Sequence, residues 1–337
     1  MKKVAILGER KAGLVEAPHL QPVEDWVVVK ILVAPMCAEY KGFVAGHKSD
    51  NLGHEAAGEV VAVAQPGPLK VGDRVVVMPL CSCGTCDLCR AGDYIYCQNG
   101  QKAARIMGSA GAPTMAQYIL KPAHLALPIP DGVSYEHASL ACCGLGPSFG
   151  AFQAMGLTAY DTVLIAGAGP VGLGALINAR FRGARAIVVE SVPWRKKRAE
   201  EMGADRVLDP NDSRILDRIR ELTGGRGVDC ALDCAGSVKA ERLCIDATRR
   251  RGRVAFVGEC NDDLAIRVSP DLIRKGLAVI GSWHYNLADY PAVMKVIRES
   301  PLIPKLISHV FPMSRVQEAF EVSASHECAK VVLKPWE

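Results

Sequence analysis

The chain alternates between short apolar runs and polar turns. In its first part, valine-rich runs at 26–34, 56–64 and 73–78 are separated by turns that contain glycine, proline or charged residues. Runs of this length and composition are typical of β-strands. The first part of the chain is therefore expected to be rich in strands.

The second part repeats a strand-like run followed by a helical stretch. The strand-like runs between residues 162 and 283 are TVLIA, ARAIVVE, RVLD, VDCALDCAG, RVAFVG and LAVIGSW. Strands that alternate with helices predict a doubly wound parallel sheet, the Rossmann arrangement. The longest uncharged run, 162–179, has 18 residues, but four glycines and a proline divide it into a strand, a turn and a helix rather than a membrane span.

The turn after the first of these strands carries a G-x-G-x-x-G motif at Gly167, Gly169 and Gly172. The first glycine permits the turn, the second lets a pyrophosphate approach the backbone, and the third brings the helix onto the sheet. Glu190 ends the next strand, where a carboxylate can bind both hydroxyls of an adenosine ribose. Its charge favours NAD over NADP, although the basic run that begins at Arg195 could accept a 2′-phosphate.

The cofactor site sets the expected domain boundaries. A Rossmann domain is predicted over 147–286, and a catalytic domain over 1–146 together with 287–337. We also assign four residues beside the motif and at strand or helix ends to the cofactor site: Pro170, Val171, Arg195 and Gly258.

Composition narrows the class of protein. Of 337 residues, 49% are hydrophobic and 23% charged, which is typical of a folded globular chain. The net charge of +4 is small, so nucleic acid is not an expected partner. The basic runs WRKKR (194–198) and RRRGR (249–253) are predicted to be solvated helix and turn ends.

Thirteen cysteines and no recognisable signal peptide predict a cytoplasmic protein with reduced thiols. Five of the cysteines lie in CSCGTCDLCRAGDYIYC, at residues 81–97. Four of these follow the spacing C-x2-C-x2-C-x7-C: Cys83, Cys86, Cys89 and Cys97. Four thiolates can close around one zinc ion and leave no open position, which indicates a structural site. An iron–sulfur cluster is the nearest alternative, but its bacterial spacing continues with x3-C-P.

Further candidate ligands lie in three other segments. Cys37 follows the strand-like run DWVVVKILVAPM, His54 and Glu55 lie in LGHE, and Cys142 and Cys143 lie in SLACCGLG. Taken singly, each is weak, because isolated cysteines and histidines are usually packed or hydrogen-bonded.

Taken together, the order of these motifs resembles the zinc-dependent medium-chain alcohol and polyol dehydrogenases. Cys37, then G-H-E, then the cysteine lobe, then a cysteine ahead of a dinucleotide motif match that family, as do VGDRV at 71–75 and KVVLKP at 330–335. The resemblance implies a mostly antiparallel, barrel-like catalytic domain of the GroES-like type. It also implies reversible oxidation of an alcohol to a carbonyl, with hydride transfer to NAD.

The resemblance also implies a catalytic zinc held by Cys37, His54 and Cys143. Cys143 is preferred to Cys142 because it directly precedes Gly144, as in the cysteine-type members of the family. Glu55 would support the ligands from outside or exchange with one of them. Three protein ligands leave one position for water or substrate.

The chain departs from the family after Cys37. The family usually has Ser or Thr two residues later, which passes the alcohol proton outward, followed by Asp. Here these positions hold Glu39 and Tyr40. Glu39 could accept the proton, act as an additional ligand, or be a surface carboxylate, and Tyr40 leaves open what orients the ring of His54.

Three residues are candidate substrate contacts. His47 lies in the short segment between Cys37 and His54, where it either contacts substrate or is solvated. Trp283 and His284, in GSWHYN, either contact a hydroxylated substrate or pack at a domain hinge.

The leading hypothesis is an NAD-dependent zinc dehydrogenase that acts on a polyol, a sugar or another secondary alcohol. The alternatives are a dehydrogenase of simple short-chain alcohols and a zinc- and nucleotide-binding protein without catalysis. Two zinc ions per chain are expected, one catalytic and one structural. The family resemblance implies a homodimer or homotetramer, and neither nucleic acid nor a membrane is an expected partner.

Overall fold

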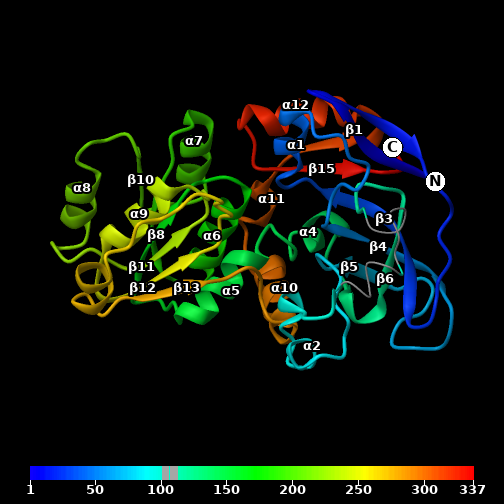
Figure 1. Ribbon diagram of the computed structural model, residues 1–337, viewed down its shortest axis with the longest axis horizontal. Coiled ribbons are helices and arrows are strands. Elements are labelled where there is room, and N and C mark those ends of the chain that lie inside the picture. The colour runs from blue at the N-terminus through cyan, green and yellow to red at the C-terminus, as the bar shows by residue number, and fades with distance from the viewer. Residues whose placement is uncertain (101–105, 107–112) are drawn as a thin grey trace. The chain divides into compact units, whose positions relative to one another are not determined.

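The protein is described by a computed structural model that covers residues 1–100, 106 and 113–337 (Figure 1). The chain divides into two compact units. The first contains Met1–Gly144, Asn286–Glu299 and Ile307–Glu337, and the second contains Leu145–Tyr285 and Ser300–Leu306. The sequence-based division placed all of 287–337 with the first unit, whereas Ser300–Leu306 belongs to the second, where Ile303 and Leu306 are buried.

The second unit is built on a six-stranded parallel sheet with the order β10-β9-β8-β11-β12-β13. Its strands are β8 (Thr162–Ala166), β9 (Arg185–Val189), β10 (Arg206–Leu208), β11 (Val228–Asp233), β12 (Thr248–Phe256) and β13 (Ala278–Gly281). The order reverses next to β8, the first strand, as in the Rossmann fold. The predicted doubly wound parallel sheet is confirmed.

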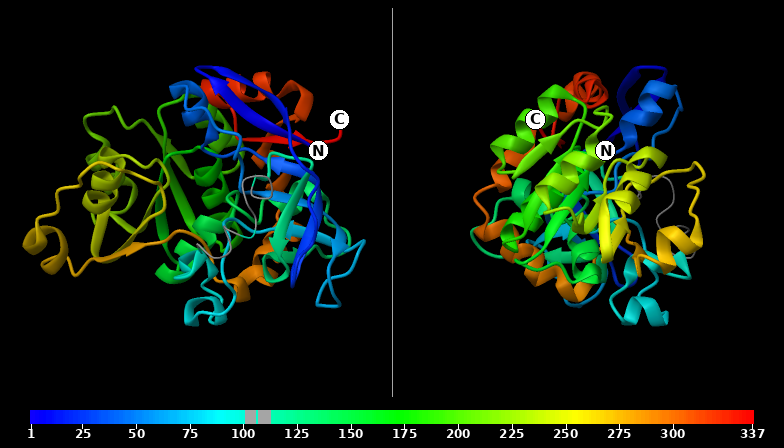
Figure 2. Two further views of the ribbon diagram at one scale, coloured as in Figure 1. Left: turned by 45° about the vertical axis from the view of Figure 1, so that its right-hand side comes forward. Right: turned by 90° about the vertical axis from the view of Figure 1, so that its left-hand side faces the viewer.

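Helices flank this sheet (Figure 2). They are α5 (Gly146–Met155), α6 (Pro170–Phe181), α7 (Pro193–Glu201), α8 (Ile215–Leu222), α9 (Val238–Ala247), α11 (Ile303–Leu306) and a π-helical turn at Val268–Ile273. The core beneath them contains Leu164, Ile187, Ala231 and Val254, one from each of four neighbouring strands. Burial on both faces explains why these strands are almost continuously apolar.

One of the two basic runs differs from its prediction. WRKKR lies in the first turns of α7, as expected. RRRGR lies inside β12 instead of at a helix or turn end. Arg249 pairs with Asp229 (2.6 Å) and Arg253 with Asp161 (2.9 Å), so two of its charges are neutralised at the start of neighbouring strands. Arginines that have carboxylate partners can therefore lie in a β-strand, although the charged sequence pattern indicated a turn.

The first unit contains a seven-stranded sheet and a separate hairpin. The sheet follows the order β14-β15-β3-β4-β5-β7, with β6 also paired to β3. Only β14 and β15 are parallel, and the other pairs are antiparallel. The strands are β3 (Trp26–Pro35), β4 (Ala56–Val63), β5 (Arg74–Val77), β6 (Tyr118–Pro122), β7 (Ala126–Pro128), β14 (Ile307–Pro312) and β15 (Lys330–Lys334), and the hairpin is β1 (Lys2–Gly8) with β2 (Lys11–Glu16).

Short helices connect these strands. They are α1 (Glu39–Ala45), α2 (Asp87–Arg90), α4 (Tyr135–Ser139), α10 (Tyr290–Glu299) and α12 (Val316–Ser325), with 3-10 turns at Tyr94–Tyr96, Ala123–Leu125, Leu287–Asp289 and Met313–Arg315. The apolar core joins Val29 and Ile31 of β3 to Phe43 of α1 and Phe320 of α12, whose rings stack 4.8 Å apart. Within the described part of the chain, no helix is long and apolar enough to cross a membrane.

Candidate metal centres and cofactor site

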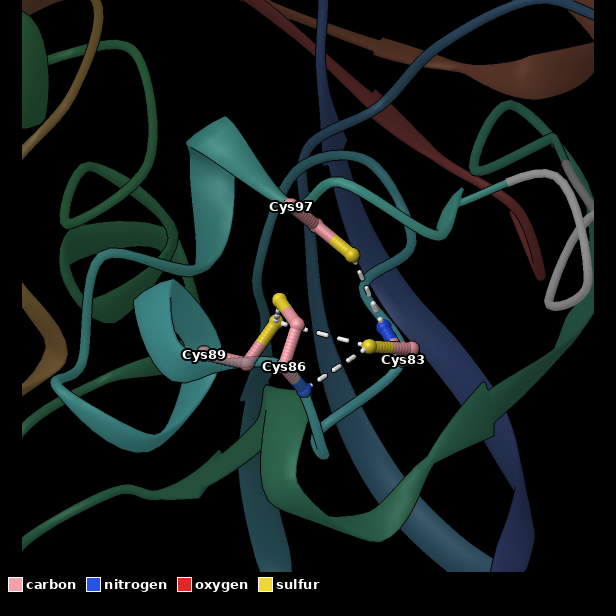
Figure 3. Close-up of side chains that lie close together, drawn as sticks. All are labelled: Cys83, Cys86, Cys89 and Cys97. Atoms are coloured by element: carbon pink, nitrogen blue, oxygen red, sulfur yellow. Dashed lines mark hydrogen bonds between the residues drawn. The ribbon is translucent and has the colours of Figure 1, made fainter.

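The four predicted lobe cysteines converge in the first unit. The Sγ atoms of Cys83, Cys86, Cys89 and Cys97 all lie within 4.8 Å of one another, and Figure 3 shows three of these side chains turned toward a common point, with Cys97 above them. Cys83 Sγ is 3.9 Å and Cys86 Sγ is 3.4 Å from Cys89 Sγ. A tetrahedral site with Zn–S bonds of about 2.3 Å places its sulfurs about 3.8 Å apart. The donor set and its spacing fit zinc.

Backbone N–H groups point at the lobe sulfurs, as thiolates require. The N–H of Cys86 donates to Cys83 Sγ (3.3 Å), and the N–H of Cys83 donates to Cys97 Sγ (3.2 Å). Hydrogen bonds from the hydroxyl and N–H of Thr85 and from the N–H of Cys86 lower the pKa of Cys83 to about 5. The lobe is therefore prepared to hold at least one thiolate at neutral pH, which favours metal binding.

The lobe is also joined to the segment that follows the second unit in sequence. Asn286 donates to Ala91 O (2.7 Å) and to Asp93 Oδ1 (2.9 Å), and the N–H of Leu287 donates to Gly92 O (3.0 Å). A Cβ on Gly92 would lie 2.2 Å from Asn286 Oδ1, so only glycine allows this approach. Nothing in the sequence pattern indicated these contacts.

A second cluster in the first unit contains Cys37, His54, Glu55 and Cys143, each with a ligand atom within 4.8 Å of the others. Cys37 follows β3, His54 and Glu55 precede β4, and Cys143 follows α4. Because β3 and β4 are antiparallel neighbours, the end of one lies beside the start of the other. Cys143 Sγ is 3.3 Å from His54 Nε2, close to the roughly 3.6 Å that a tetrahedral zinc with one sulfur and one nitrogen ligand would impose.

The Cys37 thiol is suited to be a ligand. A hydrogen bond with Cys143, and then the positive charge of Lys330 and contacts with His54, lower the pKa of Cys37 well below its usual value despite burial. Two thiols and an imidazole with one carboxylate behind them match the donor chemistry of a catalytic zinc site.

Glu55 is fully buried and paired. Its Oε1 accepts from the ammonium of Lys330, the first residue of β15, which is also fully buried. Its Oε2 accepts from the backbone N–H of Cys143 (3.1 Å), and Lys330 also donates to Met36 O (3.1 Å). Burial raises the pKa of Glu55 to about 7, and Lys330 limits the rise. Glu55 thus fixes the backbone beside one candidate ligand.

Glu39 lies on the other side of His54. Its Oε1 is 3.1 Å from His54 Nδ1, and its Oε2 accepts from the N–H of Cys37 (2.7 Å). Burial opposes the charged imidazole, but hydrogen bonds to Cys37 and Glu39 outweigh it and raise the pKa of His54 to about 11. Tyr40 instead packs its ring edge-on against His326, with centroids 5.3 Å apart.

Two further candidates lie elsewhere. Cys142 is buried, and its thiol donates to Val77 O (3.3 Å), away from the cluster that contains Cys143. His47 is exposed in the loop after α1 and is not among the clustered residues of the described chain.

The glycine turn lies in the second unit between β8 and α6. Gly167 has a φ of 95°, in the left-handed region that favours glycine. A Cβ on Gly172 would lie 1.8 Å from Gly167 O, so the helix can approach the turn only without one. At Gly169 the nearest atom to such a Cβ would be Arg195 Nη1 at 3.6 Å, so the space before the turn is open. Pro170 and Val171 begin α6, whose N-terminus would face a pyrophosphate.

Glu190 and Arg195 border this turn. Glu190 is only 7% exposed, and its carboxylate accepts from the N–H groups of Ala168 (2.8 Å), Ser191 (2.7 Å) and Val192 (2.9 Å). The hydroxyl of Ser191 also lies 3.4 Å from Oε1, so three of the four donors face Oε1, whereas Oε2 accepts only from Ala168 and keeps a position for a ribose hydroxyl. The buried Nε of Arg195 has no hydrogen-bond partner among the described residues. An anionic cofactor fits this orphaned donor.

The other predicted residues of the second unit are packed differently. Gly258 lies just after β12, where a Cβ would be 2.2 Å from Gly236 N, so its small size serves the close packing of two loops. His284 is 6% exposed and lies against Gly146 of α5, whereas Trp283 is 44% exposed. Burial of His284 favours packing within this unit.

Family models match parts of both units. The family model "Alcohol dehydrogenase GroES-like domain" matches residues 23–131, and the model "Zinc-binding dehydrogenase" matches residues 170–299. A zinc-type alcohol dehydrogenase-like protein of Escherichia coli, YphC, is 33% identical over 89% of this chain and 83% of its own. The chain belongs to the zinc-binding dehydrogenases. The resemblance predicted from the motifs is therefore confirmed.

Two further relatives of this dehydrogenase extend the likeness over its whole length. A sorbitol dehydrogenase of Bacillus subtilis is 29% identical over 99% of this chain and 97% of its own. The solved structure of the alcohol dehydrogenase TADH from Thermus sp. ATN1 is 25% identical, with a TM-score of 0.89 and 99% of each chain covered. The predicted pairing of a GroES-like domain with a Rossmann domain is confirmed by these comparisons.

Sequence reasoning missed the functional contacts that bridge distant segments of this dehydrogenase. Lys330 was noted only as the start of KVVLKP, although a lysine in an apolar strand pattern is itself a signal of a buried ion pair. The group that orients the ring of His54 was left open, and the carboxylate that faces this ring belongs to Glu39, the residue before Tyr40.

Proposed function

We propose that this dehydrogenase oxidises a secondary alcohol, such as a polyol or sugar, reversibly to a carbonyl, with NAD as the second substrate. The convergence of Cys37, His54 and Cys143 beside a buried carboxylate carries the proposal. When bound, zinc supplies Lewis acidity and NAD supplies a hydride acceptor.

The chain's own residues have distinct roles in this proposal. Cys37, His54 and Cys143 hold the zinc and leave one position open for the substrate. Glu55, neutralised by Lys330, holds the N–H of Cys143 and so fixes the direction of its side chain. The four lobe cysteines hold a second zinc whose coordination is complete, and that zinc has no part in the reaction.

The cofactor is assigned to the glycine turn. The open space at Gly169 and the orphaned Nε of Arg195 support a bound pyrophosphate, while the acceptor positions of Glu190 support the ribose of NAD. A 2′-phosphate would lie beside the buried carboxylate of Glu190, which favours NAD over NADP. Pro170, Val171 and Gly258 frame this site.

The substrate class rests on the relatives and on the ligand set. Sorbitol, on which a relative by name acts, offers secondary hydroxyl groups flanked by further hydroxyls. A dehydrogenase of short unbranched alcohols is the second candidate, favoured by a cysteine rather than a glutamate at position 143.

We further propose a cytoplasmic homo-oligomer, either a dimer or a tetramer. All thirteen cysteines, which lie among the described residues, are free thiols, which suits a reducing compartment. Among the described residues, β13 pairs on one side only and so ends the six-stranded sheet, and its Val279 is exposed, so a second copy is a suitable neighbour.

Turnover and metal content test the proposal together. Purified protein should contain two zinc ions per chain and oxidise polyols faster with NAD than with NADP. Cys37→Ser should lose one zinc and nearly all turnover while its unfolding temperature stays within a few degrees. Activity confined to unbranched primary alcohols would reject the polyol assignment, and a single zinc per chain in the wild type would reject the catalytic centre.

A further inference from the structure

The carboxylate of Glu39 contacts the ring of His54. The family resemblance placed a carboxylate with this role one residue later in the chain. Glu39 is the first residue of α1, two residues after Cys37, where the family usually has Ser or Thr. Its Oε1 lies 3.1 Å from His54 Nδ1, and its side chain is only 10% exposed. The residue at the family's Asp position, Tyr40, faces His326 instead.

The geometry points to Glu39 as the residue that positions the zinc ligand His54. In this role Glu39 is neither the acceptor of the substrate proton nor an additional zinc ligand. This inference rests on the proposed catalytic zinc. A carboxylate on Nδ1 holds a proton on that nitrogen, so Nε2, which faces Cys143, is the nitrogen that would lose its proton and offer a lone pair to a metal. It also makes the imidazole a stronger donor.

The other two readings of Glu39 fit the contacts less well. As a zinc ligand it would belong to the cluster of converging atoms, but among the described residues that cluster contains Cys37, His54, Glu55 and Cys143 only. As a proton acceptor it would need an oxygen directed at the substrate. Both of its oxygens already have partners: Oε2 accepts from the N–H of Cys37, and Oε1 contacts His54 Nδ1. Nδ1 is not the ring nitrogen that faces Cys143.

Substitution of Glu39 by glutamine tests this role, because the carboxylate of Glu39 accepts from two donors at once. Glutamate accepts from Cys37 N and from His54 Nδ1 with separate oxygens. Glutamine has one oxygen and one NH₂ group, so one donor must face another donor. In Glu39→Gln, either the N–H of Cys37 loses its acceptor or His54 moves its proton to Nε2, where it blocks metal binding. Glu39→Ala removes both acceptors.

Zinc competition with a chromophoric chelator measures the effect without reference to turnover. Glu39→Gln and Glu39→Ala should bind the Cys37–His54–Cys143 zinc 10- to 100-fold more weakly, while the lobe zinc is unchanged. In the cobalt-substituted protein, the visible absorption bands of this site should shift. Glu24→Gln, the same change at an exposed glutamate of the first unit, should leave both readouts as in the wild type.

The outcomes separate the roles. Zinc affinity within about threefold of the wild type in both variants would overturn the inference, even if turnover fell, because that result describes a proton acceptor. If the variants fail to fold, ¹⁵N-histidine spectra of the zinc-loaded wild type decide: His54 must carry its proton on Nδ1, and a proton on Nε2 overturns the inference. If Cys37→Ser loses no zinc, the proposed function fails instead.

Discussion

Lys330→Met is expected to destabilise the first unit strongly. Lys330 is fully buried on β15, and its ammonium pairs with Glu55, which is also fully buried, and donates to Met36 O. The methionine keeps most of the volume but removes the ammonium that contacts Glu55 Oε1, so the buried carboxylate loses its direct ion-pair partner. Breaking a buried pair in this way typically costs about 3–5 kcal/mol, out of a net stability of roughly 5–15 kcal/mol for a folded protein.

Lys334→Met provides a matched control on the same strand. Lys334 pairs with Glu136 where both side chains are partly exposed, so its loss should cost less than about 1 kcal/mol. Both variants remove one lysine from β15 and place methionine there. Replacing both buried partners, as in Glu55→Gln/Lys330→Met, should recover much of the loss because no unpaired charge remains.

The difference in stability between Lys330→Met and Lys334→Met can be measured by urea unfolding of the zinc-loaded proteins. Amide hydrogen exchange of peptides from β3 reports the unfolding of the first unit. With a urea dependence of about 2–3 kcal/mol per molar, the midpoint for Lys330→Met should fall by about 1–2.5 M. Peptides from β8 in the second unit serve as an internal reference. Equal midpoints for Lys330→Met and Lys334→Met would refute the reasoning about an uncompensated buried charge.

Three further predictions concern other parts of the molecule. Burial lowers the pKa of Lys121 to about 8, so between pH 8 and 10.5 the unfolded chain binds more protons at this lysine, which contributes on the order of 3 kcal/mol of stability as pH rises. In urea titrations at several pH values, the wild type should therefore gain this much stability relative to Lys121→Met. Gly172→Ala should destabilise the second unit and abolish NAD binding by calorimetry, because its Cβ would meet Gly167 O at 1.8 Å, whereas Gly281→Ala has open space and should behave as the wild type. Cys86→Ser should lose the lobe zinc and lower the unfolding temperature, and equal zinc content in Cys86→Ser and Cys81→Ser would contradict the four-cysteine site.

The local motifs could be predicted from the sequence because spacing alone determines them. The glycine turn and the strands of the second unit follow from short apolar runs, and the lobe cysteines are close in the chain. Tertiary context decided the rest. A strand containing RRRGR forms because Asp229 and Asp161 supply partners from neighbouring strands, which no window along the chain reveals.

The candidate catalytic site could be predicted only in part, for the same reason. The residue types at Cys37, His54 and Cys143 were expected, but the contacts that orient them join positions far apart. Lys330 and Glu55 are separated by 275 residues. The choice between Cys142 and Cys143 depends on which thiol turns toward Val77, a matter of backbone direction after α4.

The pairing of Glu55 with Lys330 also sets an order of events during synthesis. The lobe cysteines are complete once residue 97 has left the ribosome, and they can take up zinc early. Glu55 has to wait for a lysine 275 residues later, which at 5–20 residues per second is roughly 15–55 s. Until then Glu55 lacks the ammonium group that pairs with its Oε1 in the folded protein. The structural metal can therefore enter a nascent chain early, whereas the catalytic centre matures only after synthesis has passed residue 330.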